Sequence, residues 1–340
     1  MMKRVVLGLS GGVDSAVAAS MLKEQGYEVH GLFLDMGLGG LSEAEDVARS
    51  IGIPFHVKRC AHALEEHVCR YFAEAYRSAR TPNPCVVCNR KVKFQALIEL
   101  ADEIGAPYIA TGHYARTGKD DQGRALLMRA ASKKDQAYML AWLDRSVIAR
   151  CLFPLGEMQE KAAVRERARQ SEIPVHDKKD SMDVCFIPDG DWGRWLESRG
   201  ICLPEGNFVD PEGRILGHHR GIHRYTVGQR KGLGVASTGR LFVHELRPAT
   251  NEIVLSLEDP HRSVICLTSV NLCAPEYAEN GEFICDVRVR YSSRADRAKV
   301  RISGTEAEIS FEKPVRAPAA GQFAVFYDGD IVIGGGFIEP

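Results

Sequence analysis

A glycine-rich hexapeptide near the N-terminus has the composition of an anion-binding loop. Residues 10–15 read Ser-Gly-Gly-Val-Asp-Ser and follow an apolar run at residues 5–9. Two glycines let backbone N–H groups turn toward an anion without obstruction by a Cβ atom. The start of a helix and the hydroxyls of Ser10 and Ser15 add further donors. We therefore expect a phosphate group here, with Asp14 either capping the helix or holding Mg²⁺, because a carboxylate would repel phosphate directly.

The same loop narrows the kind of phosphate ligand. It lacks the Gly-Lys-Ser/Thr ending of a Walker A loop and the G-x-G-x-x-G spacing of dinucleotide-binding proteins. The hexapeptide resembles the pyrophosphatase loop of the ATP pyrophosphatase superfamily, whose members cleave ATP between its α and β phosphates and activate an oxygen as its adenylate. The alternative is a tight strand–helix turn without a ligand, and the complete hexapeptide in this context favours the ligand.

Cysteine is the second residue type that points to chemistry. The chain has ten cysteines, at positions 60, 69, 85, 88, 151, 185, 202, 266, 273 and 285. A disulfide scaffold is usually small and secreted, so in this longer chain we expect most thiols to be reduced and several to be buried. Cys85 and Cys88 form a C-x-x-C pair, which alone lacks two of the four ligands of a structural zinc. From the residues alone, a buried strand position and a reactive thiol are equally good interpretations of Cys185.

Alternating strands and helices must position these residues. Apolar runs predict strands at residues 5–9, 29–34, 53–57 and 108–110. Helical spacing predicts one helix through Val13, Val17 and Met21. It predicts another whose one face carries Phe94, Leu97, Ile98, Ala101 and Ile104. Ser42 and Glu45 have the spacing of a capping box, which predicts a helix that begins near Ser42. Strand–helix alternation predicts an α/β fold with a doubly wound parallel sheet, and such sheets bind ligands beyond the carboxyl ends of their strands.

The second half of the chain has a different pattern. Residues 144–172 have helical spacing, and after about residue 181 short β-rich runs separated by Gly and Pro turns dominate. These runs predict strands at residues 241–246, 252–257, 283–289, 306–311 and 322–327. Such spacing is typical of small barrels. We therefore expect a parallel-sheet domain at residues 1–180, followed by two small β-rich, barrel-like domains at residues 181–262, which carries Cys185, and 263–340.

Composition limits the class of protein. The chain has 340 residues, 45% of them hydrophobic and 26% charged, which predicts two or three ordinary globular domains. We see no apolar run long enough for a membrane span and no cleavage pattern of a signal peptide, and we expect a cytoplasmic protein. The net charge of −1 gives no global signal for nucleic acid, although a basic face can coexist with an acidic surface elsewhere.

Six further strings make the chain similar to one family. They are residues 81–89 (TPNPCVVCN), 112–114 (GHY), 134–138 (KDQAY), 183–187 (DVCFI), 225–234 (YTVGQRKGLG) and 334–336 (GGG). In this order they resemble the tRNA-specific 2-thiouridylase family from the first strand to the C-terminus. The resemblance implies an enzyme that uses ATP and Mg²⁺ to adenylate the C2 oxygen of the wobble uridine in Lys, Glu and Gln tRNAs, and then replaces this oxygen with sulfur.

The resemblance also implies roles for two of the cysteines. Cys185 would carry the sulfur as a persulfide. Cys88 would be the partner nucleophile, which either leaves a disulfide with Cys185 or frees the sulfur as hydrosulfide. A cysteine desulfurase or a relay protein would donate the sulfur. Reactive thiols need nearby positive charge. The local candidates for that charge are Arg90, Lys91, Lys178 and Lys179.

The family's ligand-binding positions match this sequence in two sets. The ATP set is Gly8, Leu9, Ser10, Gly11, Gly12, Val13, Asp14, Ser15, Leu34 and Gly112. The tRNA set is Asn83, Pro84, Cys85, His113, Lys134, Asp135, Gln136, Arg290, Tyr291 and Gln322. For Leu34 and His113 a core position is the alternative. An enzyme that acts on C2 must unstack its uridine, so a flipped-out anticodon base is a sensible substrate.

One position departs from the family pattern. Many members have Asp where this chain has Cys85, and that Asp is proposed as a general acid or base, a role that a thiol fits less well. Cys85, Cys88 and Cys185 would instead supply three sulfur ligands, enough for an iron–sulfur cluster with one open iron site. We rank this cluster below the persulfide route. The segment after Asp35 is also short for the family.

A second basic feature lies near the C-terminus. Positively charged residues recur in a strand-like segment at positions 288, 290, 294, 297, 299 and 301. Such a strand can present cations to phosphates on one face, and Tyr291 can stack on a base. On charge alone, a solvated strand is the better interpretation.

Two other functions compete with sulfur transfer to tRNA. A different ATP pyrophosphatase, such as a small-molecule amide ligase, would keep the loop but would need neither Cys88 nor Cys185. A non-catalytic tRNA-binding protein would keep the loop as a relic, and the complete loop and both cysteines argue against it.

Overall fold

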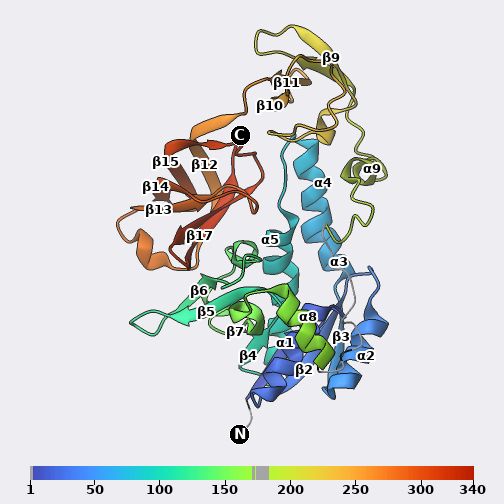
Figure 1. The fold of residues 1–340 in the computed structure, drawn as a ribbon, viewed down its shortest axis with the longest axis vertical. Coiled ribbons are helices and arrows are strands. Elements are labelled where there is room, and N and C mark those ends of the chain that lie inside the picture. The colour runs from blue at the N-terminus through green and yellow to red at the C-terminus, as the bar shows by residue number, and fades with distance from the viewer. Residues whose placement is uncertain (1–2, 171–172, 174–183) are drawn as a thin grey trace.

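The protein has three parts arranged around a pair of long helices. The computed structural model describes residues 3–170, 173 and 184–340. A parallel-sheet domain lies at one end of the molecule and a small β-sheet domain at the other, with a β-barrel beside the helices that connect them (Figure 1). Among the described residues, no helix combines the length and the apolar character that crossing a bilayer requires.

The first domain is built on a five-stranded sheet in which every neighbouring pair is parallel. In spatial order the strands are β3 (Phe55–Arg59), β2 (Glu28–Asp35), β1 (Arg4–Gly8), β4 (Tyr108–Ala110) and β7 (Cys151–Leu152). The chain moves outward from β1 to β3 and then returns to the other side of β1. The carboxyl ends of β1 and β4 therefore flank the topological switch point, where doubly wound sheets bind ligands.

Helices cover both faces of this sheet. Val5 and Leu7 pack against α1 (Val13–Glu24), whose buried alanines allow the helix to approach closely. Val6 points the other way and packs against α6 (Phe94–Glu103), because successive side chains of a strand alternate between faces. The predicted doubly wound α/β sheet is confirmed.

Two local predictions in this domain need correction. The helix near Ser42 is α2 (Leu41–Ile51), but its N-cap is Gly40 with a φ of 91°, and the Ser42 hydroxyl bonds to Glu43. The capping box is wrong because the helix already begins before Ser42. The helical stretch at residues 144–172 is instead broken into α7 (Arg145–Ile148), β7, a 3₁₀ turn η4 (Pro154–Glu157) and α8 (Lys161–Gln170).

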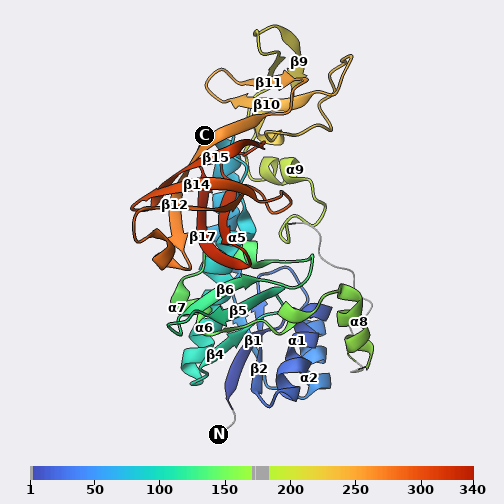
Figure 2. The ribbon, with the colours of Figure 1, turned by 60° about the vertical axis from the view of Figure 1, so that its left-hand side comes forward.

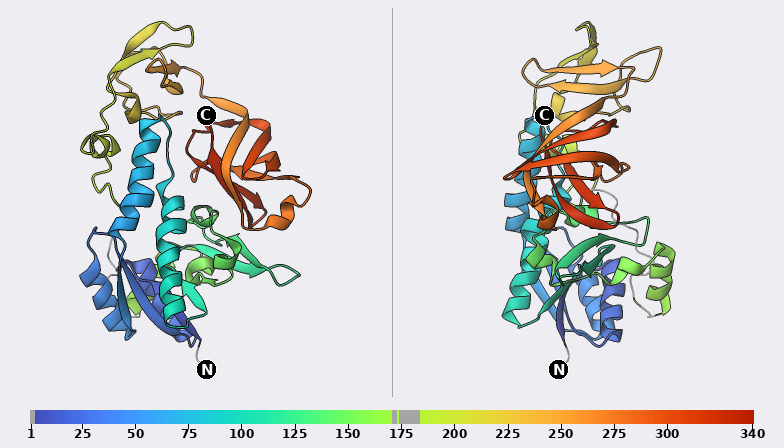
Figure 3. Two further views of the ribbon diagram at one scale, coloured as in Figure 1. Left: turned by 180° about the vertical axis from the view of Figure 1, so that it is seen from behind. Right: turned by 90° about the vertical axis from the view of Figure 1, so that its left-hand side faces the viewer.

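Two long helices, each interrupted by a π-helical turn, connect the domains. One consists of α3 (Ala61–Leu64), η1 (Glu65–Cys69) and α4 (Arg70–Arg77), and the other of α5 (Pro84–Cys88), η2 (Asn89–Lys93) and α6. The two lie side by side when seen from behind (Figure 3). A π turn widens a helix by one residue and is frequent at functional sites.

The central domain is a four-stranded sheet in the order β10-β11-β8-β9. Its strands are β8 (Gly206–Val209), β9 (Ile215–His219), β10 (Phe242–Arg247) and β11 (Glu252–Ser256), preceded by the short helix α9 (Trp192–Glu197). A separate core of Phe208, Ile222, Tyr225, Val243 and Ile253 holds it together.

The C-terminal domain is a closed six-stranded barrel, as the strand pattern predicted. Its strands are β12 (His261–Leu272), β13 (Glu282–Arg288), β14 (Asp296–Ser303), β15 (Glu306–Arg316), β16 (Phe323–Asp328) and β17 (Ile331–Ile338), and β12 pairs with β17 to close it. The glycines of the 334–336 string permit this closure. A Cβ atom on Gly334 would lie 2.2 Å from the Asn271 carbonyl oxygen, and one on Gly335 would lie 2.2 Å from the Ala324 oxygen.

A hairpin of the first domain joins the barrel, which the sequence did not predict. Strands β5 (Ala115–Lys119) and β6 (Ala125–Arg129) continue the barrel sheet through the pairing of Met128 with Ile331. They lie between the parallel sheet and the barrel (Figure 2). This pairing connects the barrel to the segment that follows β4 at the switch point.

Candidate active site

The predicted phosphate loop lies at the carboxyl end of β1. Gly11 has a φ of 70°, and a Cβ there would lie 2.9 Å from the Ala44 amide nitrogen of α2. The N-cap of α1 is Gly12, and no side chain caps the helix. The first-turn N–H groups of α1 therefore have no capping partner and can bind an anion.

The two loop serines hold the loop together. Ser15 Oγ donates a hydrogen bond to the Gly12 carbonyl oxygen at 3.0 Å and accepts one from the Ser10 amide at 3.2 Å. The Ser10 and Ser15 hydroxyl oxygens are also 3.2 Å apart. These bonds fix the path of the backbone on which the free N–H groups lie.

Asp14 is held at the edge of this loop by two distant residues. The Tyr114 hydroxyl donates to Asp14 Oδ1 at 2.9 Å, and Lys161 Nζ of α8 lies 3.6 Å from Oδ2. Asp14 does not cap α1, so that alternative is wrong. Its negative charge still lies in the first helical turn, where the helix dipole stabilises it. The Mg²⁺ alternative stays a prediction.

Gly112 lies directly against the phosphate loop from the neighbouring strand. A Cβ atom on Gly112 would lie 2.8 Å from both the Asp14 carbonyl carbon and the Ser15 amide nitrogen. This contact follows from the pairing of β4 with β1. The structure thus brings together the loop and Gly112, two parts of the ATP set that are about a hundred residues apart in sequence.

The thiols lie at the adjacent edge of the sheet. Helix α5 begins at Pro84, with Asn83 as N-cap, whose Oδ1 accepts from the Val86 amide at 3.3 Å. Cys85 and Cys88 are one turn apart on this helix, the first exposed and the second buried. Cys88 belongs to an apolar cluster that also includes Leu34, at the end of β2 beside β1. Leu34 therefore lies between the thiols and the strand that carries the loop.

Cys185 reaches this region from the other side. It lies in a turn and is exposed, so the interpretation as a buried strand residue is wrong. The two residues that follow it, Phe186 and Ile187, are buried in the same apolar cluster as Cys88. They anchor the exposed thiol beside α5.

Lys93 and Cys185 contribute to the pKa of both Cys88 and Cys85. Burial raises the pKa of Cys88 to about 11, Lys93 acts against this, and Cys185 and Cys85 raise it further. Burial by the surrounding protein also raises the pKa of Cys85, although its side chain is exposed. Lys93 lowers this pKa, and Cys185 raises it. All ten cysteines are free thiols.

Lys93 is the residue that the sequence reasoning missed. It is half-buried and makes no hydrogen bond or ion pair with any residue that the structure describes. Burial lowers the pKa of its ammonium group, but Cys88, Cys85 and Cys185 raise it by more.

The π turn explains why Lys93 faces Cys88. Residues five apart in a regular α-helix point about 140° away from each other, which hid the relationship in the sequence. The extra residue in the η2 turn brings position i+5 close to the same side as position i. Burial lowers the pKa of His113, and Lys93 lowers it further, to about 3. His113 is therefore neutral.

Of the four cations predicted to activate the thiols, the structure describes Arg90 and Lys91, and neither contributes to the pKa of Cys85 or Cys88. Arg90 donates to Asp144 at 2.8 Å, and its guanidinium lies 4.7 Å from the centre of the Trp142 ring. Lys91 is exposed and changes the pKa of neither Cys85 nor Cys88. Lys178 and Lys179 lie outside the described residues. Arg90 fails because its side chain leaves the helix toward Trp142, away from Cys88.

Metal binding finds no support in the arrangement of side chains. Within residues 3–170, 173 and 184–340, no group of three or more His, Cys, Asp or Glu side chains is placed to hold a metal ion. Cys85, Cys88 and Cys185 as placed thus do not form the three-sulfur site of an iron–sulfur cluster.

Several residues of the predicted tRNA set hold the domains together. Gln322 of the barrel donates from Nε2 to the carbonyl oxygens of Thr81 at 3.1 Å and Pro82 at 3.2 Å. This fixes the segment that enters α5 at Asn83. His113 Nδ1 lies 2.7 Å from the Thr111 hydroxyl, at the end of β4.

The 134–138 string has a similar mixture of roles. Asp135 is buried, and its Oδ1 accepts from the Ala130 and Ala137 amides at 3.0 and 3.1 Å. Gln136 Oε1 accepts from the Tyr114 amide at 3.0 Å. Lys134 is exposed. Of the three predicted tRNA contacts here, Lys134 is the one whose side chain reaches the surface.

Arg290 and Tyr291 are better placed to meet a ligand. Arg290 donates from Nη2 to the Val227 oxygen at 2.7 Å, while its buried Nε has no hydrogen-bond partner among the described residues. Tyr291 is 38% exposed and contacts Tyr138 edge to face, with ring centres 5.8 Å apart. An unpaired donor beside an exposed aromatic ring suits a phosphate next to a stacked base.

The strand of cations does not form a free basic face. On β14, Arg297 lies 3.6 Å from Asp286, Lys299 lies 2.9 Å from Glu282, and Arg301 lies 3.6 Å from Glu308. Cross-strand carboxylates on β13 and β15 neutralise these cations. These ion pairs agree with a solvated strand, the interpretation that charge alone favours, and not with a phosphate-binding face along β14.

Three family models match the chain in succession. They are described as a tRNA methyl transferase HUP domain over residues 3–189, a tRNA methyl transferase PRC-barrel domain over residues 196–257, and an aminomethyltransferase beta-barrel domain over residues 251–338. Together they span nearly the whole chain.

Relatives that match over their full length are named for a different reaction. The tRNA-specific 2-thiouridylase MnmA of Clostridium acetobutylicum is 40% identical over 357 aligned residues, covering 100% of both chains. The protein of the same name from Lachnoclostridium phytofermentans is 42% identical and covers 99% of both chains. A solved structure of NMN synthetase from Francisella tularensis aligns with a TM-score of 0.34 at 20% identity, over 52% of this chain and 66% of that one.

Proposed function

Because this chain belongs to the tRNA-specific 2-thiouridylase family, it is a tRNA uridine 2-sulfurtransferase, and we propose that it activates the uridine at the phosphate loop and draws its sulfur from Cys185. The observation that carries this proposal is one apolar cluster that holds Cys88, the two residues after Cys185, and Leu34, at the end of β2 beside the strand that carries the loop. An amide ligase would have no use for these thiols, and the family-model names that mention methyl transfer do not account for them.

ATP is the nucleotide of this family's loop, and Mg²⁺ accompanies it. We propose that the phosphates bind the uncapped N–H groups at the start of α1 and that backbone at Leu34 and Gly112 contacts the adenine. Mg²⁺ is usually held by phosphate oxygens, waters and one or two carboxylates. Asp14 is the carboxylate at this loop that fits that role.

The reaction then needs three steps and a final reduction. The uridine O2 attacks the α-phosphorus of ATP, pyrophosphate leaves, and C2 carries an adenylated oxygen. The terminal sulfur of a Cys185 persulfide attacks C2, and AMP leaves with the oxygen. The Cys88 thiolate attacks the Cys185 sulfur, which breaks the sulfur–sulfur bond, leaves sulfur on C2 and joins Cys88 to Cys185. A thiol reductant must then reduce this disulfide for the next turnover.

Lys93 supplies the charge that this sequence of steps requires. The thiolate, and not the thiol, is the nucleophile, yet burial holds the pKa of Cys88 near 11. The ammonium group of Lys93 favours the anionic form of Cys88 and of Cys85. It has no carboxylate partner among the described residues that would compete for it.

Replacing Lys93 with methionine is expected to slow sulfur transfer by about tenfold or more at neutral pH, because losing a nearby cation raises a thiol pKa by about one unit or more. The rate of Cys88 alkylation by iodoacetamide, measured against pH, should shift to higher pH by the same amount. Lys93→Arg keeps the charge and should restore most of both properties. An unshifted alkylation profile in Lys93→Met would contradict this role.

For tRNA we propose that the wobble uridine of Lys, Glu and Gln tRNAs is flipped out toward Asn83, Pro84 and Cys85 at the start of α5. Exposed Lys134, Arg290 with its unpaired Nε, and Tyr291 support contacts to the neighbouring nucleotides. A cysteine desulfurase or a relay protein remains our proposed sulfur donor. A cytoplasmic location remains a prediction.

An iron–sulfur cluster on the three thiols is the lesser alternative, and we derive no step through it because the sulfurs as placed do not form a metal-binding group. Protein purified without oxygen is expected to contain no stoichiometric iron or sulfide and to be fully active. Iron and sulfide analysis alongside activity tests this, and activity that depends on bound iron would overturn the persulfide route.

One assay separates the candidate functions. The protein is incubated with ATP, a sulfur donor and tRNA, and the digested nucleosides are analysed for 2-thiouridine. An amide ligase or a non-catalytic tRNA-binding protein would give no product. Release of AMP and pyrophosphate that depends on tRNA would support the adenylation step independently of the sulfur step.

A further inference from the structure

The 225–234 string lies at the junction of all three domains. The Thr81 hydroxyl of the first domain donates to the Thr226 hydroxyl at 3.2 Å. Arg290 of the barrel donates to the Val227 oxygen at 2.7 Å, and a Cβ atom on Gly228 would lie 2.6 Å from the Ala317 Cβ. None of these contacts belongs to the phosphate loop or to the thiols, so the string needs another explanation.

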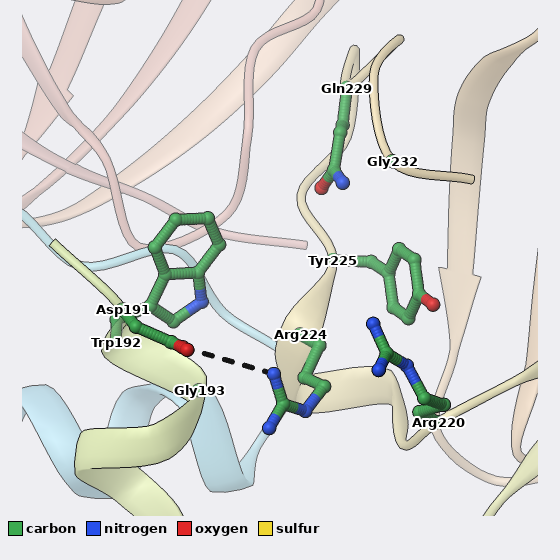
Figure 4. Close-up of a pocket in the computed structure, with 8 residues that line it drawn as sticks. All are labelled: Asp191, Trp192, Gly193, Arg220, Arg224, Tyr225, Gln229 and Gly232. Atoms are coloured by element: carbon green, nitrogen blue, oxygen red, sulfur yellow. Dashed lines mark ion pairs between the residues drawn. The ribbon is translucent and has the colours of Figure 1, made fainter. Parts of the chain in front are cut away.

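A pocket adjoins this string, between α9 and the central sheet (Figure 4). Its walls include Trp192 and the side chains of Arg220 and Tyr225. The Trp192 ring stacks on Tyr76 of α4 with ring centres 6.2 Å apart, which fixes its position. The pocket is therefore built from the central domain and supported by a helix of the first domain.

The pocket contains hydrogen-bond donors that lack acceptors. Trp192 Nε1 is buried and has no hydrogen-bond partner among the described residues. Arg220 is exposed and makes no hydrogen bond or ion pair within the described part of the chain. A buried donor without an acceptor costs free energy, so an oxygen-rich ligand that meets it is stabilised.

The other charged groups of the pocket are already paired. Arg224 binds Glu197 and lies 3.8 Å from Asp191, whose carboxylate also accepts from the Arg194 amide at 2.9 Å. A Cβ atom on Gly193 would lie 2.5 Å from Arg224 Nη1, so the glycine leaves room for this pair. Among the residues that line the pocket, Asp191 is the acid and Arg220 and Arg224 are the bases, so the lining has a net positive charge.

We propose that this pocket binds a phosphate of the tRNA backbone, so that the central domain holds the RNA while the target uridine lies at the thiols. The proposal rests on the function proposed above and adds a binding subsite to it. Arginine suits phosphate because its planar group donates two parallel hydrogen bonds. Two further exposed cations of the string, Arg230 and Lys231, extend the positive surface along the path of a polynucleotide. A free phosphate would not need them.

Arg220→Gln is expected to weaken binding of full-length tRNA by about threefold to tenfold and to reduce the slope of log affinity against log salt concentration by about one. The matched control is Arg49→Gln, which removes the same charge from an exposed arginine paired within α2. It should change neither affinity nor slope.

A second variant separates hydrogen bonding from charge. Trp192→Phe keeps an aromatic ring on Tyr76 but removes Nε1, and is expected to weaken tRNA binding by about twofold to fivefold with an unchanged salt slope. If neither variant changes tRNA binding, the proposal is wrong. If Arg220→Gln instead alters inhibition by inorganic pyrophosphate and leaves tRNA binding intact, the pocket binds a free anion and the proposal is likewise overturned.

These measurements do not depend on catalysis. Equilibrium binding of tRNA tests the pocket, whereas formation of 2-thiouridine tests the proposed reaction. A protein that binds tRNA through Arg220 but forms no 2-thiouridine would refute the reaction alone.

Discussion

Replacing Cys185 with serine is expected to reduce formation of 2-thiouridine by more than about a thousandfold, because a hydroxyl cannot carry a persulfide. The substitution changes one atom of an exposed side chain, and the buried Phe186 and Ile187 still anchor the turn. ATP should therefore still bind, and tRNA-dependent release of pyrophosphate should continue. The measurement is mass spectrometry of digested tRNA together with detection of pyrophosphate.

Two further cysteine variants make this result specific. Cys266→Ser changes an exposed thiol on β12 of the barrel and should leave the activity intact. Cys88→Ser should also stop turnover, but at a later step: the uridine C2 should stay joined through sulfur to Cys185, since the nucleophile that breaks the sulfur–sulfur bond is gone. Product formed without Cys185 would refute the assignment of the sulfur carrier.

The parallel sheet and its ligand site were predictable because they depend on local patterns. Each strand is a short apolar run bounded by turns, and β1 with α1 frames the glycine-rich loop. Given alternating strands and helices, the switch point must lie where the chain returns past β1. Gly112 follows β4 at that point, so its contact with the loop is a consequence of the topology.

Lys93 was not predictable, because its position depends on a departure from regular geometry. Regular α-helical spacing puts it away from Cys88, and only the π turn at Asn89–Lys93 brings it back. The ion pairs of the cations on β14 were not predictable for a related reason. Their acid partners, such as Asp286 and Glu308, come from neighbouring strands, and the pairing register decides which residues meet.

The residues that resemble the family's tRNA contacts fall into two groups, which differ in the hydrogen bonding and exposure of their side chains. Gln322 donates from its side chain to two backbone carbonyl oxygens before α5, and Asp135 is buried against amides of its own loop. These residues shape the approach to the thiols. Lys134, Arg290 and Tyr291 retain exposed or unpaired groups, and so can touch RNA. Sequence similarity alone does not separate these two kinds of position.

Replacing Gly112 with alanine is expected to weaken ATP binding by about tenfold to a hundredfold, and adenylation with it, although the backbone at Gly112 has no unusual conformation. The added Cβ would lie 2.8 Å from backbone atoms of Asp14 and Ser15, which cannot rotate away as a flexible side chain can. The start of α1 must therefore shift, and with it the N–H groups that bind the phosphates. A displacement of about 1 Å at such a site is enough to cost about a hundredfold.

A glycine with a different neighbour supplies the matched control for this prediction. A Cβ atom on Gly118 of β5 would meet the Met128 sulfur at 2.7 Å, and methionine can move because it is unbranched and flexible. Gly118→Ala should thus bind ATP as the unaltered protein does. Titration calorimetry with ATP, alongside thermal unfolding to show that both variants fold, makes the comparison. If Gly112→Ala binds ATP normally, the carboxyl end of β4 does not position the phosphate loop.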